Sequence, residues 1–120
     1  MAFNGTEGKP IDLRKAKRWT KRYREQCREN GEKNPIKAHF FGCDIINDIL
    51  AEEGCKGIRI YYGLNDDGEK QLLLVGAKAD HNNILPSEVG GKDGASGIIA
   101  DDSATCPTVC PEGDDPLGDG

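Results

Sequence analysis

The stretch that decides the fold is Gly57-Ile58-Arg59-Ile60-Tyr61-Tyr62-Gly63-Leu64, followed by Asn65-Asp66-Asp67-Gly68 and then by the segment from Gln71 to Ala79. The first stretch alternates, so residues 58, 60, 62 and 64 line one face of a strand. The next four residues are typical of a tight turn, in which Gly68 supplies a positive φ. The pattern predicts a β-hairpin over 57–64 and 71–79.

The return strand is apolar at every position from Leu72 to Val75, so it needs cover on both faces. A two-stranded hairpin is not stable alone, and we expect residues 97–100 to add a third strand. Residues 80–96 read as a long polar loop. The face that the helices leave open must be covered by the 80–110 segment or by a second copy of the chain. The 80–110 segment is rich in glycine and polar residues, so it is a poor lid.

Two amphipathic helices are predicted before the hairpin. The first spans about 12–29, with Asp12 as its N-cap and Asn30-Gly31 at its end. The second spans about 43–53 and ends at Gly54, after a short segment at 37–41 that could be extended. The expected fold is therefore α+β, with both helices packed on a small antiparallel sheet and an irregular C-terminal tail.

The chain has 120 residues, which suits one domain. We expect a flexible arm over 1–9, a single α+β domain over 10–110 and an acidic disordered tail over 111–120. No apolar run reaches the length of a membrane helix, and the N-terminal residues do not resemble a signal peptide. These features predict a cytoplasmic protein without a membrane partner.

Several strings occur together: Lys37-Ala38-His39-Phe40-Phe41-Gly42, the strand from Gly57 to Gly63, and Cys106-Pro107-x-x-Cys110. With Trp19-x-x-x-Tyr23-Arg24 in the first helix, this combination resembles a group of small uncharacterised bacterial proteins. The resemblance covers about residues 11–110. It supports the architecture and implies no activity, cofactor or site.

The five cysteines cannot all pair within one chain, and in a reducing compartment we expect free thiols. Cys106 and Cys110 could supply two zinc ligands or form a redox pair, but no second close pair of ligands accompanies them. The simpler interpretation is a thiol pair that pins the C-terminus. His39 and Cys43 are the candidates for a catalytic dyad, but the simpler interpretation is a small apolar cysteine and a histidine that caps or packs.

Charge is distributed unevenly along the chain. Residues 9–37 hold 11 basic and 4 acidic side chains, whereas residues 93–120 hold 7 acidic and no basic ones. Lys17, Lys21 and Arg28 on the first helix are the candidates for binding a polyanion. An overall pI of about 5.0 disfavours nucleic acid as the partner. The other interpretations are a solvated helix face or a docking site for the acidic tail.

These observations predict a non-catalytic protein-interaction module that self-associates, most simply as a two-fold dimer, and that binds an unidentified protein partner. No group of titratable residues indicates an enzyme, and no cofactor is expected. Two alternatives remain: polyanion binding by the first helix, and a thiol or zinc protein that uses the C-terminal cysteine pair.

Overall fold

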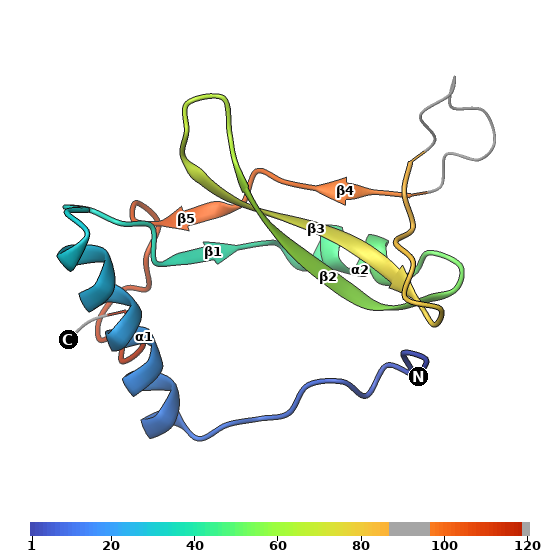
Figure 1. Cartoon of the computed structure of the whole chain (residues 1–120), viewed down its shortest axis with the longest axis horizontal. Coiled ribbons are helices and arrows are strands. Elements are labelled where there is room, and N and C mark those ends of the chain that lie inside the picture. The colour runs from blue at the N-terminus through green and yellow to red at the C-terminus, as the bar shows by residue number, and fades with distance from the viewer. Residues whose placement is uncertain (87–96, 119–120) are drawn as a thin grey trace. The chain divides into compact units, whose positions relative to one another are not determined.

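The computed structural model describes residues 1–86 and 97–118, which form two compact units. The sheet unit comprises Met1–Glu7 and Phe41–Ser103, and the helix unit comprises Gly8–Phe40 and Ala104–Gly120. In the sheet unit lie α2 (Cys43–Leu50), β2 (Cys55–Leu64), β3 (Lys70–Lys78) and β4 (Ile99–Ala100). In the helix unit lie α1 (Leu13–Glu29), β1 (Ala38–Phe40) and β5 (Ala104–Cys106) (Figure 1).

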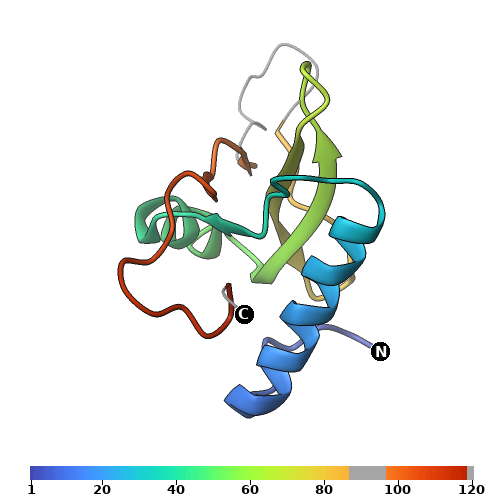
Figure 2. The same cartoon turned by 90° about the vertical axis from the view of Figure 1, so that its left-hand side faces the viewer.

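The sheet unit is built on the predicted hairpin. Its strands run in the order β2-β3-β4, and both neighbouring pairs are antiparallel. The register from Leu64↔Lys70 to Ile58↔Gly76 is continuous, and the hairpin forms a long twisted ribbon (Figure 2). The third strand expected at 97–100 is present at Ile99–Ala100. The prediction of an antiparallel sheet around this hairpin is therefore confirmed.

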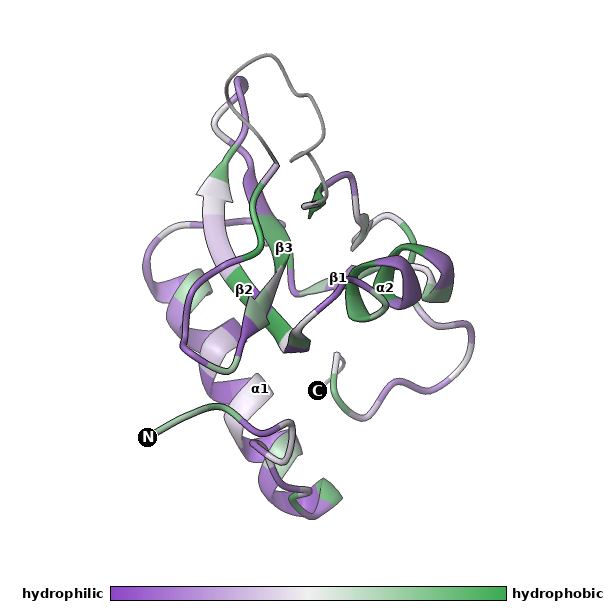
Figure 3. Ribbon diagram, turned by 90° about the vertical axis from the view of Figure 1, so that its right-hand side faces the viewer, coloured by the Kyte–Doolittle hydropathy of each residue, from purple (hydrophilic) through white to green (hydrophobic). Residues whose placement is uncertain are grey.

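One face of this sheet packs against α2. Ile49 on α2 is fully buried and forms the core with Leu74 and Ala100. Gly76 marks the closest approach, because a Cβ at that position would lie 2.9 Å from Oε1 of Glu52 and 3.1 Å from Sγ of Cys55. Figure 3 shows apolar and polar colours on the same helix, as expected of an element that buries only one side.

The residues of β3 that point away from α2 include Val75 and Ala77, and both are buried. Ile84, from the segment after β3, is buried as well. The N–H of Ile84 donates to the carbonyl of Gly76 at 2.8 Å, and the N–H of Phe3 donates to Ala79 at 2.9 Å. The bond from Ile84 and the bridge between Asn83 and Ala77 extend the sheet along the edge of β3. Cover of the sheet face by the 80–110 segment stays a prediction, and 87–96 lie outside the described residues.

The helix unit begins with the predicted N-cap. The carboxylate of Asp12 accepts a hydrogen bond from the N–H of Lys15 at 2.8 Å, and the helix ends at Asn30-Gly31, where Gly31 has a φ of +87°. β1 pairs with β5 in an antiparallel register from Ala38↔Cys106 to Phe40↔Ala104. The expected irregular tail therefore contains a short strand.

The α+β class is confirmed, but the predicted arrangement holds in part only. α2 packs on the hairpin sheet, whereas α1 belongs to the helix unit rather than to the sheet unit. On α1 the expected apolar stripe is also incomplete: Cys27 is buried, but half of Trp19 is exposed. Arg24 is only 6% exposed, which is unusual for an arginine on an amphipathic basic helix.

Candidate binding surfaces

The basic face of α1 contains the three residues proposed for polyanion binding. Lys17, Lys21 and Arg28 lie four and seven residues apart, which places them on one side of the helix. All three side chains are exposed, and Lys21 lies 3.7 Å from Glu25 in a half-exposed ion pair. Such a pair contributes little in water, so it does not cancel the excess of positive charge. In Figure 3 most of α1 has the hydrophilic colour.

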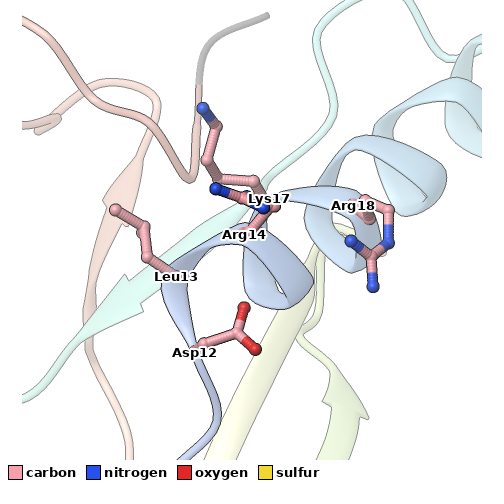
Figure 4. A pocket seen from close by; sticks show the side chains of 5 residues that line it. All are labelled: Asp12, Leu13, Arg14, Lys17 and Arg18. Atoms are coloured by element: carbon pink, nitrogen blue, oxygen red, sulfur yellow. The ribbon is translucent and has the colours of Figure 1, made fainter.

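A hollow of about 610 Å³ lies over the first turn of α1. It is lined by Asp12, Leu13, Arg14, Lys17 and Arg18. Lys17 and Arg18 extend in different directions from the helix (Figure 4). The hollow is open and its one carboxylate caps the helix, so it is a cationic surface rather than an enclosed site.

A second hollow, of about 340 Å³, lies in the helix unit near the end of α1. Three cations line it: Arg24, Arg28 and Lys37. Nη1 of Arg24 donates to the carbonyl of Leu117 at 2.5 Å, and Nζ of Lys37 donates to the carbonyl of Gly118 at 2.6 Å. These hydrogen bonds explain why Arg24 is buried. They also bear on the docking interpretation, because the C-terminal segment contacts the helix unit's cations through backbone carbonyls.

The cysteine pair contributes to the same hollow. Cys106 and Cys110 form a disulfide, and Cys110 lines the hollow together with Pro107. Cys106 is 2% exposed within β5, whereas Cys110 is exposed. The expectation of free thiols is therefore wrong for this pair, while Cys27, Cys43 and Cys55 are free thiols.

The zinc hypothesis finds no assembled site in the described part of the chain. No group of three or more His, Cys, Asp or Glu side chains is gathered there around one point. A structural zinc ion needs four ligands with deprotonated thiols, and the sulfurs of Cys106 and Cys110 are bonded to each other. Zinc binding by this pair would require its reduction and stays a prediction.

The candidate dyad is divided between the two units. His39 lies on β1 in the helix unit, where burial lowers the pKa of its imidazole. Cys43 is exposed at the first position of α2 in the sheet unit, as predicted. Its thiol donates to the carboxylate of Asp44 at 3.9 Å. The contact that the structure gives to this thiol is therefore a neighbouring carboxylate, and catalysis by the pair remains a hypothesis.

The outer edge of the sheet unit holds an exposed apolar row. Within the described residues, β2 pairs with β3 only, so its other edge is open. Three alternate residues of β2 point to one face and are strongly exposed: Ile60 at 55%, Tyr62 at 92% and Leu64 at 71%. We refer to Ile60, Tyr62 and Leu64 as the apolar row. The sequence placed all three on one face but did not show that α2 leaves them uncovered.

A polar cluster that the sequence did not reveal lies on the other face of β2. Nη1 of Arg59 donates to the side chain of Asn83 at 2.6 Å, and Nδ2 of Asn83 donates to the hydroxyl of Tyr61 at 2.8 Å. The hydrogen bond from Asn83 and the charge of Arg59 lower the pKa of Tyr61. Phe3 stacks on His81 with ring centroids 4.4 Å apart. These contacts fix the N-terminal segment against the sheet.

A shallow hollow of about 330 Å³ lies beside this cluster, between the N-terminal segment and the start of β2. It is lined by both charge signs, with Lys56 and Arg59 opposite Glu7. The carboxylate of Glu7 accepts hydrogen bonds from the N–H groups of Asn4 and Gly5, which lower its pKa. Both oxygens of the Glu7 carboxylate therefore bond within the N-terminal turn. The described residues that line the hollow do not converge on a single ligand.

Comparison with known proteins gives no identification. No family model, no curated protein and no solved structure matches this chain. The resemblance to small uncharacterised bacterial proteins therefore remains a prediction. Among the helices of the described residues, none has both the length and the apolar character that crossing a membrane requires.

Proposed function

We propose that this chain is a protein-interaction module that self-associates as a two-fold dimer through the open edge of β2. The observation that carries this proposal is the apolar row, whose side chains are 55% to 92% exposed on an edge strand of ten residues. Long apolar edge strands recruit further strands. A second copy of the same strand is the simplest partner, because isologous dimers are the commonest assemblies.

The backbone of β2 also supports pairing of a second copy at this edge. The N–H of Asn65 donates to Glu69 across the turn at 2.9 Å. Hydrogen-bonded pairs alternate along an antiparallel ladder, so the N–H and C=O groups of residues 60, 62 and 64 point away from β3. The bond from Ile84 to the carbonyl of Gly76 fits this alternation, since it lies on the far side of β3. The apolar row thus offers side chains and backbone groups together.

The exposed row is self-complementary about its middle residue. A two-fold axis at Tyr62 would pair the two Tyr62 residues with each other and Ile60 with Leu64 of the second copy. Each pair would exchange two backbone hydrogen bonds, so three pairs would form about six. Natural edge strands usually carry a charge, a proline or a bulge that blocks such pairing. From Ile60 to Leu64, β2 has neither charge nor proline, and its bulge lies at Cys55/Gly57.

Light scattering on the full chain tests this proposal. We expect a dimer at about 100 μM protein in both low and high salt, because the contact is apolar. Tyr62→Lys should make the chain monomeric, because it brings two charges together on the axis. Leu50→Lys is the control, since Leu50 is also exposed, at 45%, but lies on α2 rather than on β2. A monomeric wild type at that concentration would overturn the proposal.

Cross-linking tests the register. In a Cys43→Ser background, Tyr62→Cys would place one new cysteine from each copy on the two-fold axis. Their Cα atoms would lie about 5.5 Å apart, within the range for a disulfide. We expect an oxidised dimer on a denaturing gel. Tyr61→Cys is the matched control, because residue 61 faces residue 63 of the second copy. Equal cross-linking of both variants would contradict the register while leaving the mass measurement as the test of dimerisation.

The second candidate function is polyanion binding by the basic face of α1. The observation in its favour is that Lys17, Lys21 and Arg28 lie exposed on one side of a helix with eight basic residues. A shift assay with random-sequence DNA and RNA tests it. Retention that falls steeply with salt and is lost when these three charges are reversed would support this function.

The sequence also predicts a cytoplasmic protein, and this location is part of the proposal. Cell fractionation tests it.

A further inference from the structure

The apolar side of α1 is buried at one end of the helix and exposed at the other. At about 100° per residue, its apolar residues fall within an arc of about 120°. Along this arc the exposed fraction rises from 3% at Cys27 to 50% at Trp19 and 57% at Leu13. Tyr23, between them, is 40% exposed and donates its hydroxyl to the carbonyl of Ile36 at 3.3 Å. The end of α1 is therefore held by its own unit, while its first half presents Leu13 and Trp19 to solvent.

Cations border this apolar side on both edges. The first ten residues of α1 include no acidic side chain and six basic ones, which are Arg14, Lys15, Lys17, Arg18, Lys21 and Arg22. Lys17 follows Leu13 by one turn on one edge. Lys15 lies on the other edge, where its Nζ is 5.3 Å from the centre of the Trp19 ring. Figure 4 shows Leu13 and Arg18 extending to different sides of the first turns. The first half of α1 therefore combines an exposed apolar side with positive charge along both of its borders.

This charge pattern is unfavourable for an isolated helix. The first turn holds no acidic residue, although the positive end of a helix dipole favours acids there. Cations four positions apart repel each other, and three such pairs are present: Arg14 with Arg18, Lys17 with Lys21, and Arg18 with Arg22. An anionic surface with an apolar interior would relieve this repulsion and cover the apolar side as well. A nucleic-acid duplex would do only the first, because it presents phosphates to the helix.

We propose that α1 binds the surface of a membrane containing anionic phospholipids, with Leu13 and Trp19 inserted at the acyl chains and the bordering cations at the lipid phosphates. A strongly basic face opposite exposed Trp and Leu side chains is typical of helices that lie in the plane of the interface. Tryptophan suits this depth because its ring is apolar while its N–H can reach the headgroups. The sequence predicted no membrane partner because it lacks a spanning run and a signal peptide, and a surface-bound helix requires neither.

This proposal rests on the second candidate function, because it uses the same basic helix and identifies the polyanion as a lipid surface. It is independent of the dimer, whose apolar row lies on β2 in the sheet unit. It also agrees with the expected cytoplasmic location, since the cytoplasmic leaflet of a cell membrane carries anionic lipids.

The fluorescence of Trp19 tests the insertion directly, because Trp19 is the only tryptophan of the chain. The full chain is mixed at low salt with vesicles of phosphatidylcholine, either alone or with added phosphatidylserine. We expect binding to be about tenfold tighter with phosphatidylserine. The Trp19 emission should shift to shorter wavelength and be quenched by brominated acyl chains. Absence of binding, or binding with unchanged Trp19 emission, would overturn the proposal.

Flotation with the same vesicles measures the contribution of the apolar side. Trp19→Ser should weaken binding about tenfold and Leu13→Ser about fivefold, because each removes an inserted apolar side chain. Phe40→Ser is the matched control, since Phe40 belongs to the same unit and is 68% exposed, but lies on β1. Circular dichroism verifies that each variant is folded. Equal binding by the wild type, Trp19→Ser and Leu13→Ser would contradict the insertion and with it the proposal.

Charge variants and nucleic acid complete the test. Lys17→Gln should weaken binding to the vesicles about fivefold, whereas Lys56→Gln, at an exposed position of β2, should not. Trp19→Ser should leave any retention of DNA or RNA unchanged, because phosphate contacts do not require the indole. A chain that retains nucleic acid without binding vesicles would overturn the lipid proposal and leave the second candidate function standing. Vesicle binding without retention of nucleic acid would support the lipid surface as the partner of α1.

Discussion

Ile49→Ala is the substitution that tests most directly how α2 is held on the hairpin sheet. Ile49 is 0% exposed and is the only fully buried large side chain among the described residues. Its side chain packs with Leu74 on β3 and Ala100 on β4, so it joins the helix to two strands. Removing it should weaken the whole sheet unit rather than one local contact.

The magnitude follows from the burial. Truncating a fully buried isoleucine to alanine costs about 2–5 kcal/mol, because transfer energy is lost and a cavity remains. Alanine regains about 0.4 kcal/mol through its higher helix propensity. We therefore expect the free energy of unfolding to fall by about 3 kcal/mol. With a urea dependence of about 1 kcal/mol/M for so small a unit, the midpoint should fall by about 2–3 M.

Urea unfolding followed by circular dichroism measures this change, and the neighbouring residue supplies the control. Leu50 has nearly the same size and helical position but is 45% exposed, so Leu50→Ala should cost about 1 kcal/mol. Ile49→Val provides a milder variant, with an expected cost of about 1 kcal/mol, in case the alanine variant does not fold. Equal losses for Ile49→Ala and Leu50→Ala would refute the placement of α2 on the sheet.

Three further predictions concern stability. Asp12→Ala should cost about 1 kcal/mol in thermal unfolding of α1, and Asp12→Asn much less, because the N–H of Lys15 loses its acceptor only in the alanine variant. Gly76→Ala should cost about 1–3 kcal/mol by overpacking, whereas Gly57→Ala, with nothing within 4 Å, should not show that loss. Burial raises the pKa of Glu52, whose oxygens have no hydrogen-bond partner among the described residues. Stability should therefore fall as pH rises from 4.5 through the raised pKa, and Glu52→Gln should remove this dependence in urea titrations.

Glu52 illustrates how a local pattern and a tertiary environment differ. It follows the last turn of α2, where a charged side chain ordinarily faces solvent, yet both carboxylate oxygens are buried. The reason is the close approach at Gly76, which admits the side chain between α2 and the sheet. The backbone N–H of Ile98 lowers the pKa of Glu52 and so offsets part of this rise, although it does not form a hydrogen bond with either carboxylate oxygen. No sequence signal near residue 52 encodes this contact.

The hairpin and α1 could be predicted because their signals are local. Alternation, a turn at Asn65–Gly68 and an N-cap at Asp12 act over a few residues, and each is present as expected. The pairing of β1 with β5 joins residues that are more than 60 positions apart, and neither segment has a pattern of its own. The assignment of α1 to a separate unit likewise depends on contacts that helical periodicity does not report.

The candidate surfaces, too, could be predicted only where they depend on local sequence spacing. The basic face of α1 and the face shared by Ile60, Tyr62 and Leu64 follow from spacing alone. What spacing does not give is which residues remain exposed: α2 is short and covers only part of the sheet. The hollow at Cys110 was missed for a related reason, because Arg24, Lys37 and the cysteine pair come from three separate segments. The sequence indicated the chemistry of these residues but not that they lie around one hollow.

The two proposals can be tested independently because they use different units. Tyr62→Lys changes an exposed residue on β2 in the sheet unit, whereas Arg28→Gln changes the wall of a hollow in the helix unit. Residues with no shared partners contribute additively, so neither substitution should alter the readout of the other. If Tyr62→Lys abolished the retention of nucleic acid, or if Arg28→Gln abolished the dimer, the two surfaces would be coupled. That result would require a dimer in which the cations of one copy act at the edge strand of the other, which is a different assembly from the one proposed.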